Sequence, residues 1–347
     1  MIGVIKMGKL FIAGGRPPNM DFSSIIGQKE IVGRLKNSIK HKKVGHAYIF
    51  SGPEGIGKKT IARAFAHMLL CSRPEEDRGC GKCISCRLWA KSTNPDFNIT
   101  ESEGLSIAVN DIRDMQSDMV VKPLYSDRKV YLIVNGEKMT MQAQNCLLKT
   151  LEEPPEYGVI ILTTSNYDAL LDTVCSRCTK YSFVKNTREE VQKVLESKLR
   201  NKGKDLDFII QYSDGVIGTA LELAMSDEFV PLREKTIEII LELETTAVSS
   251  KFLDICGFFV ENKDNIDKVL NIMLLVYRDL AVLLADGKEN ILINSDKKNK
   301  IVNVANRYTL EKLVKNIEII EFIRRSIKQN ANYQLAIETM IIRLQED

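Results

Sequence analysis

A glycine-rich turn between an apolar run and a helical pattern constrains this chain more than any other feature. The apolar run 47–50 predicts a buried strand, and the segment 61–70 has the pattern of a helix. Between them, Gly52, Gly55 and Gly57 allow the backbone to turn tightly, so that its amide groups point inward at a polyphosphate. A strand, a phosphate-binding loop and a helix in this order predict a nucleotide-binding α/β module with a parallel sheet.

The residues that end this loop both support and limit nucleotide chemistry. Lys58 is placed to reach the β- and γ-phosphate oxygens. A hydroxyl group that ligates Mg²⁺ usually follows that lysine directly, but here Lys59 follows and Thr60 comes one residue late. The loop therefore predicts binding of ATP or ADP without metal-assisted hydrolysis. A glycine-rich turn that binds no ligand is the alternative.

Two further buried strands are predicted at 130–134 and 159–162, and the first of them lacks the expected carboxylates. A hydrolase needs acidic residues at that strand end, to hold Mg²⁺ and to polarise the attacking water. Asn135 and Gly136 stand there instead. Glu137 follows, but on an extended chain its side chain points to the opposite face from position 136, and only a one-residue bulge would bring it back. We therefore expect a degenerate acidic site.

Four of the eight cysteines lie close together, with the spacing C-x₈-C-x₂-C-x₂-C. Thiolates two residues apart can converge on one tetrahedral ion, and four of them close a structural zinc site. A redox C-x-x-C pair is the alternative, although such a pair needs no third or fourth cysteine. We expect one structural zinc ion per chain in a module at 71–86, held by Cys71, Cys80, Cys83 and Cys86.

Composition limits the class of protein. The 347 residues are too many for one ordinary core, and 44% hydrophobic with 27% charged residues excludes a collagen, a disordered protein and a coiled-coil rod. The formal charge of +3 is too small for a histone-like nucleic-acid binder. The most apolar C-terminal run, 272–285, contains two charges and is too short to span a membrane. We expect a cytoplasmic protein whose other cysteines are reduced thiols, namely Cys146, Cys175, Cys178 and Cys256.

The predicted secondary-structure pattern changes twice along the chain. Residues 20–185 alternate strand and helix patterns, whereas 186–226 read as short helices that begin with a capping box at 187–190. Residues 227–347 show only helical periodicity. The first 19 residues lack all these patterns, and we expect a disordered extension or an upstream start.

Two further motifs make the chain resemble a known family. The run 143–155 resembles the A-x-N-x-L-L-K-x-L-E-E-P segment of AAA+ clamp-loader subunits of bacterial DNA polymerase III, and 176–178 resembles their S-R-C motif. With 94–96 (Asn-Pro-Asp), the loop and the cysteine module in place, the resemblance covers about 20–347. It implies an AAA+ P-loop module (a parallel sheet with helices on both faces and a zinc-module insertion), a small helical lid domain, and an all-α C-terminal collar domain for oligomerisation.

Two kinds of clamp-loader subunit share this architecture, ATPase motor subunits and a non-hydrolysing subunit. Motor subunits carry a hydroxyl after the loop lysine, a D-E pair at the second strand, and an arginine in a G-x-x-R-x-A segment of the lid. This chain has Lys59, then Asn135 with Gly136, and then Gly218 in place of the arginine. The three departures imply the subunit that is not an enzyme on its own. A divergent active motor subunit, in which Glu137 replaces the missing pair, is the alternative.

The resemblance also implies partners and a mechanism. Motor subunits, a delta subunit and this chain form a hetero-pentameric ring, which loads the sliding clamp onto primer–template DNA. Arg177 reaches the ATP site of the adjacent subunit as an arginine finger supplied in trans, and a surface or capping arginine is the alternative. The strand end 163–166 either senses the γ-phosphate or forms a simple turn. Lys149 and Glu152 are expected to be solvated helix charges.

Overall fold

The computed structural model describes residues 21–102, 104, 106–199, 206–243, 248–286 and 292–345. The extension expected at 1–19 lies outside these residues. The chain divides into two compact units. One extends to Lys198 and includes Gly215–Thr219, and the other comprises Leu199–Asp214 and Ala220–Asp347. The lid expected at 186–226 is divided between the two units, so its status as a separate domain stays a prediction.

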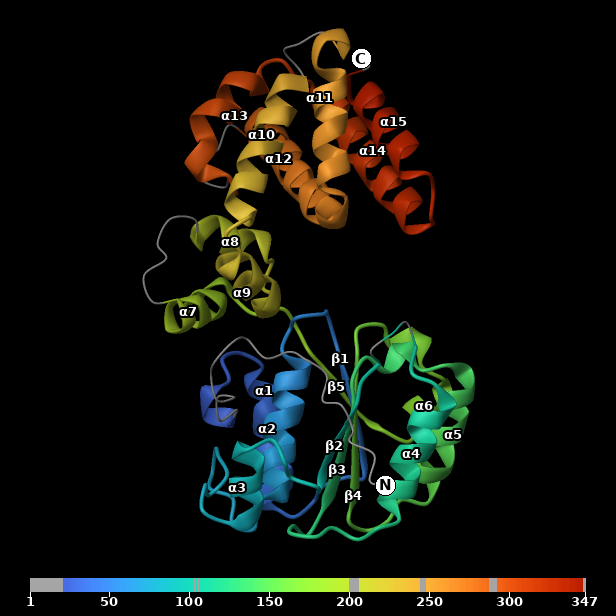
Figure 1. The fold of residues 1–347 in the computed structure, drawn as a ribbon. Helices are drawn as coiled ribbons and strands as arrows, with labels where there is room; N and C mark the ends of the chain where they lie inside the picture. The colour runs from blue at the N-terminus through green and yellow to red at the C-terminus, as the bar shows by residue number, and fades with distance from the viewer. Residues whose placement is uncertain are drawn as a thin grey trace. The chain divides into compact units, whose positions relative to one another are not determined.

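The first unit is built on a five-stranded parallel sheet with the order β2-β3-β4-β1-β5 (Figure 1). Its three central strands confirm the strands expected at 47–50, 130–134 and 159–162, because each is an apolar run that the sheet buries on both faces. The two edge strands are short and partly exposed, and the sequence did not predict them. The strands are β1 (Ala47–Ser51), β2 (Phe97–Thr100), β3 (Lys129–Ile133), β4 (Gly158–Thr164) and β5 (Thr179–Ser182).

Helices cover both faces of this sheet, as the sequence predicts (Figure 1). Successive side chains of a strand point to opposite faces, so Phe50 lies in the core beneath α1 and α2, whereas Ile49 lies in the core beneath α4 and α5. The helices are α1 (Lys29–Lys40), α2 (Lys58–Leu70), α3 (Ile84–Ala90), α4 (Val109–Met119), α5 (Met141–Glu152) and α6 (Asp172–Cys175), with short 3₁₀ turns at η1 (Phe22–Ser24), η2 (Gly136–Lys138) and η3 (Tyr167–Ala169).

The chain leaves the sheet through the expected capping box. The backbone N–H of Thr187 donates to Oε2 of Glu190 at 3.1 Å, and the backbone N–H of Glu190 donates to Oγ1 of Thr187 at 3.3 Å. Both bonds satisfy N–H groups at the start of α7 that have no partner within the helix. The short helices here are α7 (Arg188–Lys198), α8 (Leu206–Tyr212) and α9 (Ile217–Met225).

Every described element after residue 227 is helical, which confirms the expected all-α region. α12 packs against α10, α13 and α14, and α15 packs against α11 and α14. None of the described helices combines the length and the apolar character needed to cross a membrane. The elements are α10 (Phe229–Leu243), α11 (Val248–Glu261), η4 (Lys263–Asn265), α12 (Ile266–Asp286), η6 (Ser295–Lys297), α13 (Lys298–Ala305), α14 (Leu310–Lys328) and α15 (Tyr333–Gln345).

Candidate functional site

The phosphate-binding loop connects β1, a central strand, to α2. Gly55 and Gly57 have φ angles of +76° and +105°, a region that other residues rarely adopt, and they turn the chain so that α2 begins at Lys58. The N-terminal end of α2 therefore opens at the carboxyl end of the sheet, where its N–H groups and its dipole favour an anion. This geometry suits a polyphosphate.

The side chain of Lys58 folds back and contacts the backbone of the phosphate-binding loop. Its ammonium group donates to the carbonyl oxygens of Gly52 at 2.6 Å and of Pro53 at 2.8 Å, and the side chain is buried. Burial lowers the pKa of Lys58, whereas the charges of Glu137 and Glu54 raise it. To reach a phosphate, this ammonium group has to exchange the two carbonyl oxygens for phosphate oxygens.

The second lysine of the loop is paired with a carboxylate outside the loop. Nζ of Lys59 lies 2.6 Å from Oε2 of Glu101, which follows the edge strand β2. This ion pair offsets the charge at the position where a Mg²⁺-binding hydroxyl is usual. Thr60 lies one residue further along α2, half-buried.

The end of β3 corrects one expectation. Asn135 adopts a left-handed conformation (φ 55°, ψ 59°) and turns the chain into η2, so the alternation of an extended strand does not apply to the next residues. Glu137 therefore points toward the end of β4, where its Oε1 accepts hydrogen bonds from the backbone N–H of Ser165 at 3.1 Å and from the Ser165 hydroxyl. The expectation that position 137 continues the extended chain was wrong.

Glu137 thus supplies a carboxylate at the carboxyl end of the sheet, near enough to Lys58 of the phosphate-binding loop for its charge to raise the pKa of that lysine. Burial raises its pKa, but hydrogen bonds, among them those from Ser165, outweigh burial and hold the pKa of this carboxyl below its usual value. Its Oε2 is buried and makes no hydrogen bond within the described residues. The polar strand end also fixes the turn, because Oγ1 of Thr163 accepts from the backbone N–H of Asn135 at 3.2 Å.

A segment that returns to the first unit lies directly on the phosphate-binding loop. The backbone N–H of Gly218 donates to the carbonyl oxygen of Gly55 at 2.8 Å. A Cβ atom at position 218 would lie 2.7 Å from that same oxygen, so only glycine fits here without displacing the backbone. The segment is anchored by Asn186, whose side-chain amide donates to the carbonyl oxygen of Gly215 at 3.0 Å.

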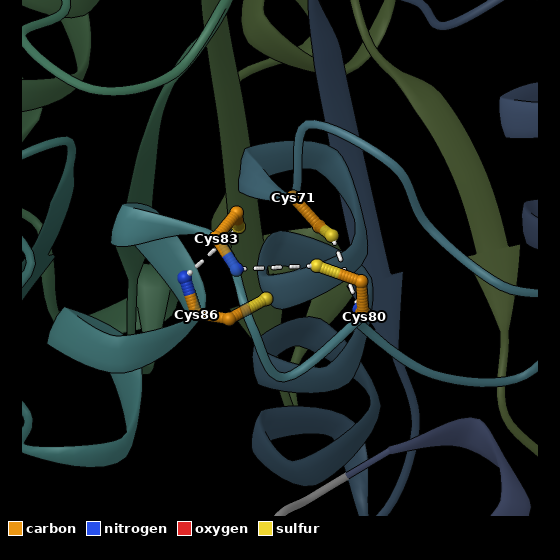
Figure 2. A group of neighbouring side chains, drawn as sticks. All are labelled: Cys71, Cys80, Cys83 and Cys86. Carbon is orange, nitrogen blue, oxygen red and sulfur yellow. Dashed lines mark hydrogen bonds between the residues drawn. The ribbon is translucent and has the colours of Figure 1, made fainter.

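The four cysteines of the predicted metal site come together between α2 and α3 (Figure 2). Their sulfur atoms all lie within 4.8 Å of one another, which accommodates the edge of about 3.8 Å that Zn–S bonds of about 2.3 Å give a tetrahedron. Backbone N–H groups donate to three of the sulfurs at 3.2 to 3.4 Å, as suits thiolate ligands. The residues are Cys71, Cys80, Cys83 and Cys86.

The cysteine module rests on a buried histidine that the sequence did not single out. The ring of His67 stacks on Trp89 with centroids 5.0 Å apart and an angle of 7° between the planes, and its Nδ1 lies 3.0 Å from Oδ1 of Asp21. His67 precedes Cys71 by one helical turn, and Trp89 follows Cys86 on α3. The stack therefore joins α2, which ends directly before Cys71, to α3, which contains Cys86.

The predicted arginine finger lies at the surface, where it is held by its own chain. Nη2 of Arg177 lies 2.8 Å from Oε1 of Glu152, and Nη1 donates to the carbonyl oxygen of Thr173 at 2.9 Å. Glu152 is the last residue of α5, so the structure joins the two motifs that carried the resemblance. As expected, Glu152 is an exposed charge at a helix end, and in addition it forms this ion pair.

Comparisons with known proteins agree with this architecture. The model of the family described as DNA polymerase III, delta subunit, matches residues 27–187, and the model described as DNA polymerase III, delta subunit, C terminal, matches residues 231–346. The chain is 29% identical to DNA polymerase III subunit delta′ of Bacillus subtilis over 324 residues, which cover 92% of this chain and 96% of that protein.

Subunits of other names are also similar. The tau subunit of Bacillus subtilis is 25% identical over 345 residues, 93% of this chain and 61% of that protein. The gamma subunit of Buchnera aphidicola is 35% identical over 208 residues, 58% of this chain and 57% of that protein. A crystal structure of a gamma-subunit-related protein from Thermotoga maritima has a TM-score of 0.49 and 20% identity, and covers 90% of this chain and 98% of that one.

The parallel sheet, the phosphate-binding loop between β1 and α2 and the mostly helical C-terminal region define a P-loop protein of the AAA+ class. The matched families cover most of both the sheet-containing region and the C-terminal helices. The chain belongs to the family of DNA polymerase III clamp-loader subunits, and it is a homologue of delta′.

Proposed function

We propose that this chain is the non-hydrolysing subunit of the clamp loader, with the role of delta′. In this proposal it joins motor subunits and a delta subunit in a five-membered ring in the bacterial cytoplasm. The ring loads the sliding clamp onto primer–template DNA. The C-terminal helices 227–347 form the collar that holds the ring together, and the P-loop module faces the DNA.

The contact between Gly218 and Gly55 is the main support for the proposal that the chain does not hydrolyse ATP. In motor subunits the resemblance implies an arginine at this lid position, and here backbone occupies the space that a side chain would need. Lys58 is engaged by carbonyl oxygens of the loop, and no hydroxyl follows it directly. ATP or ADP can still bind through the loop amides and Lys58, but the usual Mg²⁺ ligands are missing.

The catalytic contribution of the chain is then made in trans. A guanidinium group stabilises the charge that spreads over a transferring γ-phosphoryl group, and such a finger contributes about 10³ to 10⁵ in rate. Arg177 suits this role because it is partly exposed and follows a short helix at the surface. It would complete the ATP site of the adjacent subunit.

The zinc ion in this proposal is structural, with one ion per chain. Four cysteine sulfurs leave no open position for water or substrate, which is the pattern of a structural rather than a catalytic site. The ion would fix the module at 71–86 to α2 and α3. Its chemistry supplies no step of the reaction.

A ring reconstituted with the Arg177→Ala variant tests the finger. We expect the ring to assemble with its normal stoichiometry, while turnover at the site that Arg177 completes falls by about 10³-fold or more. Arg113→Ala, at an exposed position on α4, is the matched control and should leave turnover unchanged. Normal turnover with Arg177→Ala would remove the finger from the proposal.

A divergent, active motor subunit is the second candidate, and the position of Glu137 favours it. That carboxylate lies beside the loop with one oxygen free of hydrogen bonds within the described chain, so it offers a ligand or a base. The similarity to tau and gamma subunits points the same way. In this candidate the isolated chain hydrolyses ATP, and Glu137→Gln abolishes the activity.

A further inference from the structure

The two terminal nitrogens of the Arg177 guanidinium are both engaged within the chain. Nη2 pairs with Oε1 of Glu152 at 2.8 Å, and Nη1 donates to the carbonyl oxygen of Thr173 at 2.9 Å and to Oγ of Ser176 at 3.3 Å. These two nitrogens carry four of the five N–H donors of a guanidinium group, and arginine binds a phosphate through pairs of such donors. Arg177 therefore cannot use both of them on a neighbour's nucleotide while it keeps these contacts.

The ion pair is of the kind that exchanges readily. The side chains of Arg177 and Glu152 are 36% and 51% exposed, and exposed ion pairs contribute only about 0–1 kcal/mol to stability. Arg233 in the C-terminal unit offers a contrast, because it is 2% exposed and lies 2.6 Å from Asp296. A phosphate group carries more charge than one carboxylate and accepts two parallel hydrogen bonds from arginine, so it competes well for Arg177.

The position of Glu152 in its helix does not favour an acidic side chain. It is the last residue of α5, where the negative end of the helix dipole disfavours a carboxylate. The next residue, Glu153, is also exposed and has no ion pair among those described. The two acidic residues differ in that Glu152 alone reaches the guanidinium group.

We infer that Glu152 is a latch: its carboxylate holds the guanidinium group of Arg177 against its own module. A nucleotide bound to the neighbouring subunit releases the latch when it replaces this carboxylate. The inference rests on the proposed role of Arg177 as a finger in trans. When ATP fills the adjacent site, its γ-phosphate replaces the Glu152 carboxylate as the partner of Nη2. The latch lowers the apparent affinity for that ATP, because only the released fraction of Arg177 is competent to bind it.

The test compares rings that contain the wild-type chain or the Glu152→Gln variant, with turnover measured as a function of ATP concentration. Glutamine keeps the shape of the side chain and removes its charge. We expect the ATP concentration for half-maximal turnover to fall by about 2- to 5-fold, the factor that an exposed ion pair supports, while the maximal rate is unchanged. Glu153→Gln is the matched control and should change neither quantity.

Two other results would overturn the latch. A lower maximal rate with Glu152→Gln would mean that Glu152 holds Arg177 in its active orientation, and an unchanged ATP curve would mean that the ion pair has no effect. The double variant Glu152→Gln/Arg177→Ala separates this inference from the proposed function. Its curve should match that of Arg177→Ala alone. If Arg177→Ala itself turns over like the wild type, the finger fails rather than the latch.

Discussion

The backbone N–H of Gly218 donates a hydrogen bond of 2.8 Å to the carbonyl oxygen of Gly55, the central glycine of the phosphate-binding loop. The two backbones leave no room for a side chain at position 218. A Cβ atom there would lie 2.8 Å from the Cα atom of Gly55 and 2.7 Å from its carbonyl oxygen. The lid position and the loop are thus in direct contact.

Gly218→Ala should therefore destabilise the P-loop unit. A methyl group has to push the two backbones apart, and overpacking of this kind costs about 1–3 kcal/mol. Thermal or urea unfolding measures the loss. Gly33→Ala is the control, because among the described residues no atom outside the adjoining backbone of α1 lies within 4 Å of its Cβ position. Alanine there should instead stabilise the protein by about 0.5–1 kcal/mol. Equal stabilities for the two variants would contradict the close contact.

Zinc content tests the metal centre. Elemental analysis should find one zinc ion per chain in the wild type and none in Cys83→Ser, which leaves only three sulfur ligands. Loss of the ion should lower the unfolding temperature by about 5 °C or more, because binding of a structural zinc ion contributes to the free energy of folding. Cys256→Ser, far from the cluster in sequence and outside it, should retain the full zinc content. A metal-free wild type would remove the site.

The Glu137 carboxylate should make stability depend on pH. Its pKa lies below 4.5 in the folded protein, so the ionised form is favoured by folding. The resulting stabilisation is present above about pH 4.5 and is lost as the pH falls through the folded-state pKa. The wild type should therefore unfold at a higher temperature than Glu137→Gln at pH 7, and the difference should shrink in acid.

Ser165→Ala provides the matching variant for this prediction, because it removes the hydroxyl that donates to Glu137. We expect it to lose part of the same pH-dependent stabilisation and to have little further effect in the Glu137→Gln background. A difference between wild type and Glu137→Gln that grows toward low pH would show that the carboxyl is bound in its protonated form.

The sequence predicted the central strands and the cysteine cluster because residues close together in the chain determine both. β1, β3 and β4 are buried on two faces and therefore consist of continuous apolar residues, and the metal-site cysteines are close together in the chain. The edge strand β2 has only one neighbour, and its Ile99 is 39% exposed, so no apolar run marks it.

The details of the site depend on backbone geometry and on contacts between distant residues. Glu137 points toward the end of β4 because Asn135 adopts a left-handed conformation, which asparagine tolerates but does not require. The pairing of Glu152 with Arg177 arises because α5 ends where the chain after α6 passes, and no local pattern encodes that meeting. The sequence therefore identified Arg177 and not the residue that holds it.

Steady-state ATP turnover by the isolated chain tests the central claim most directly. The wild type and Lys58→Ala should be assayed side by side with Mg²⁺ and primed DNA, together with a measurement of nucleotide binding by each. We predict that the wild type binds nucleotide more tightly than Lys58→Ala, and that it hydrolyses ATP no faster than this variant. Turnover that depends on Lys58 and is abolished by Glu137→Gln would contradict the account, and it would establish an active motor subunit instead.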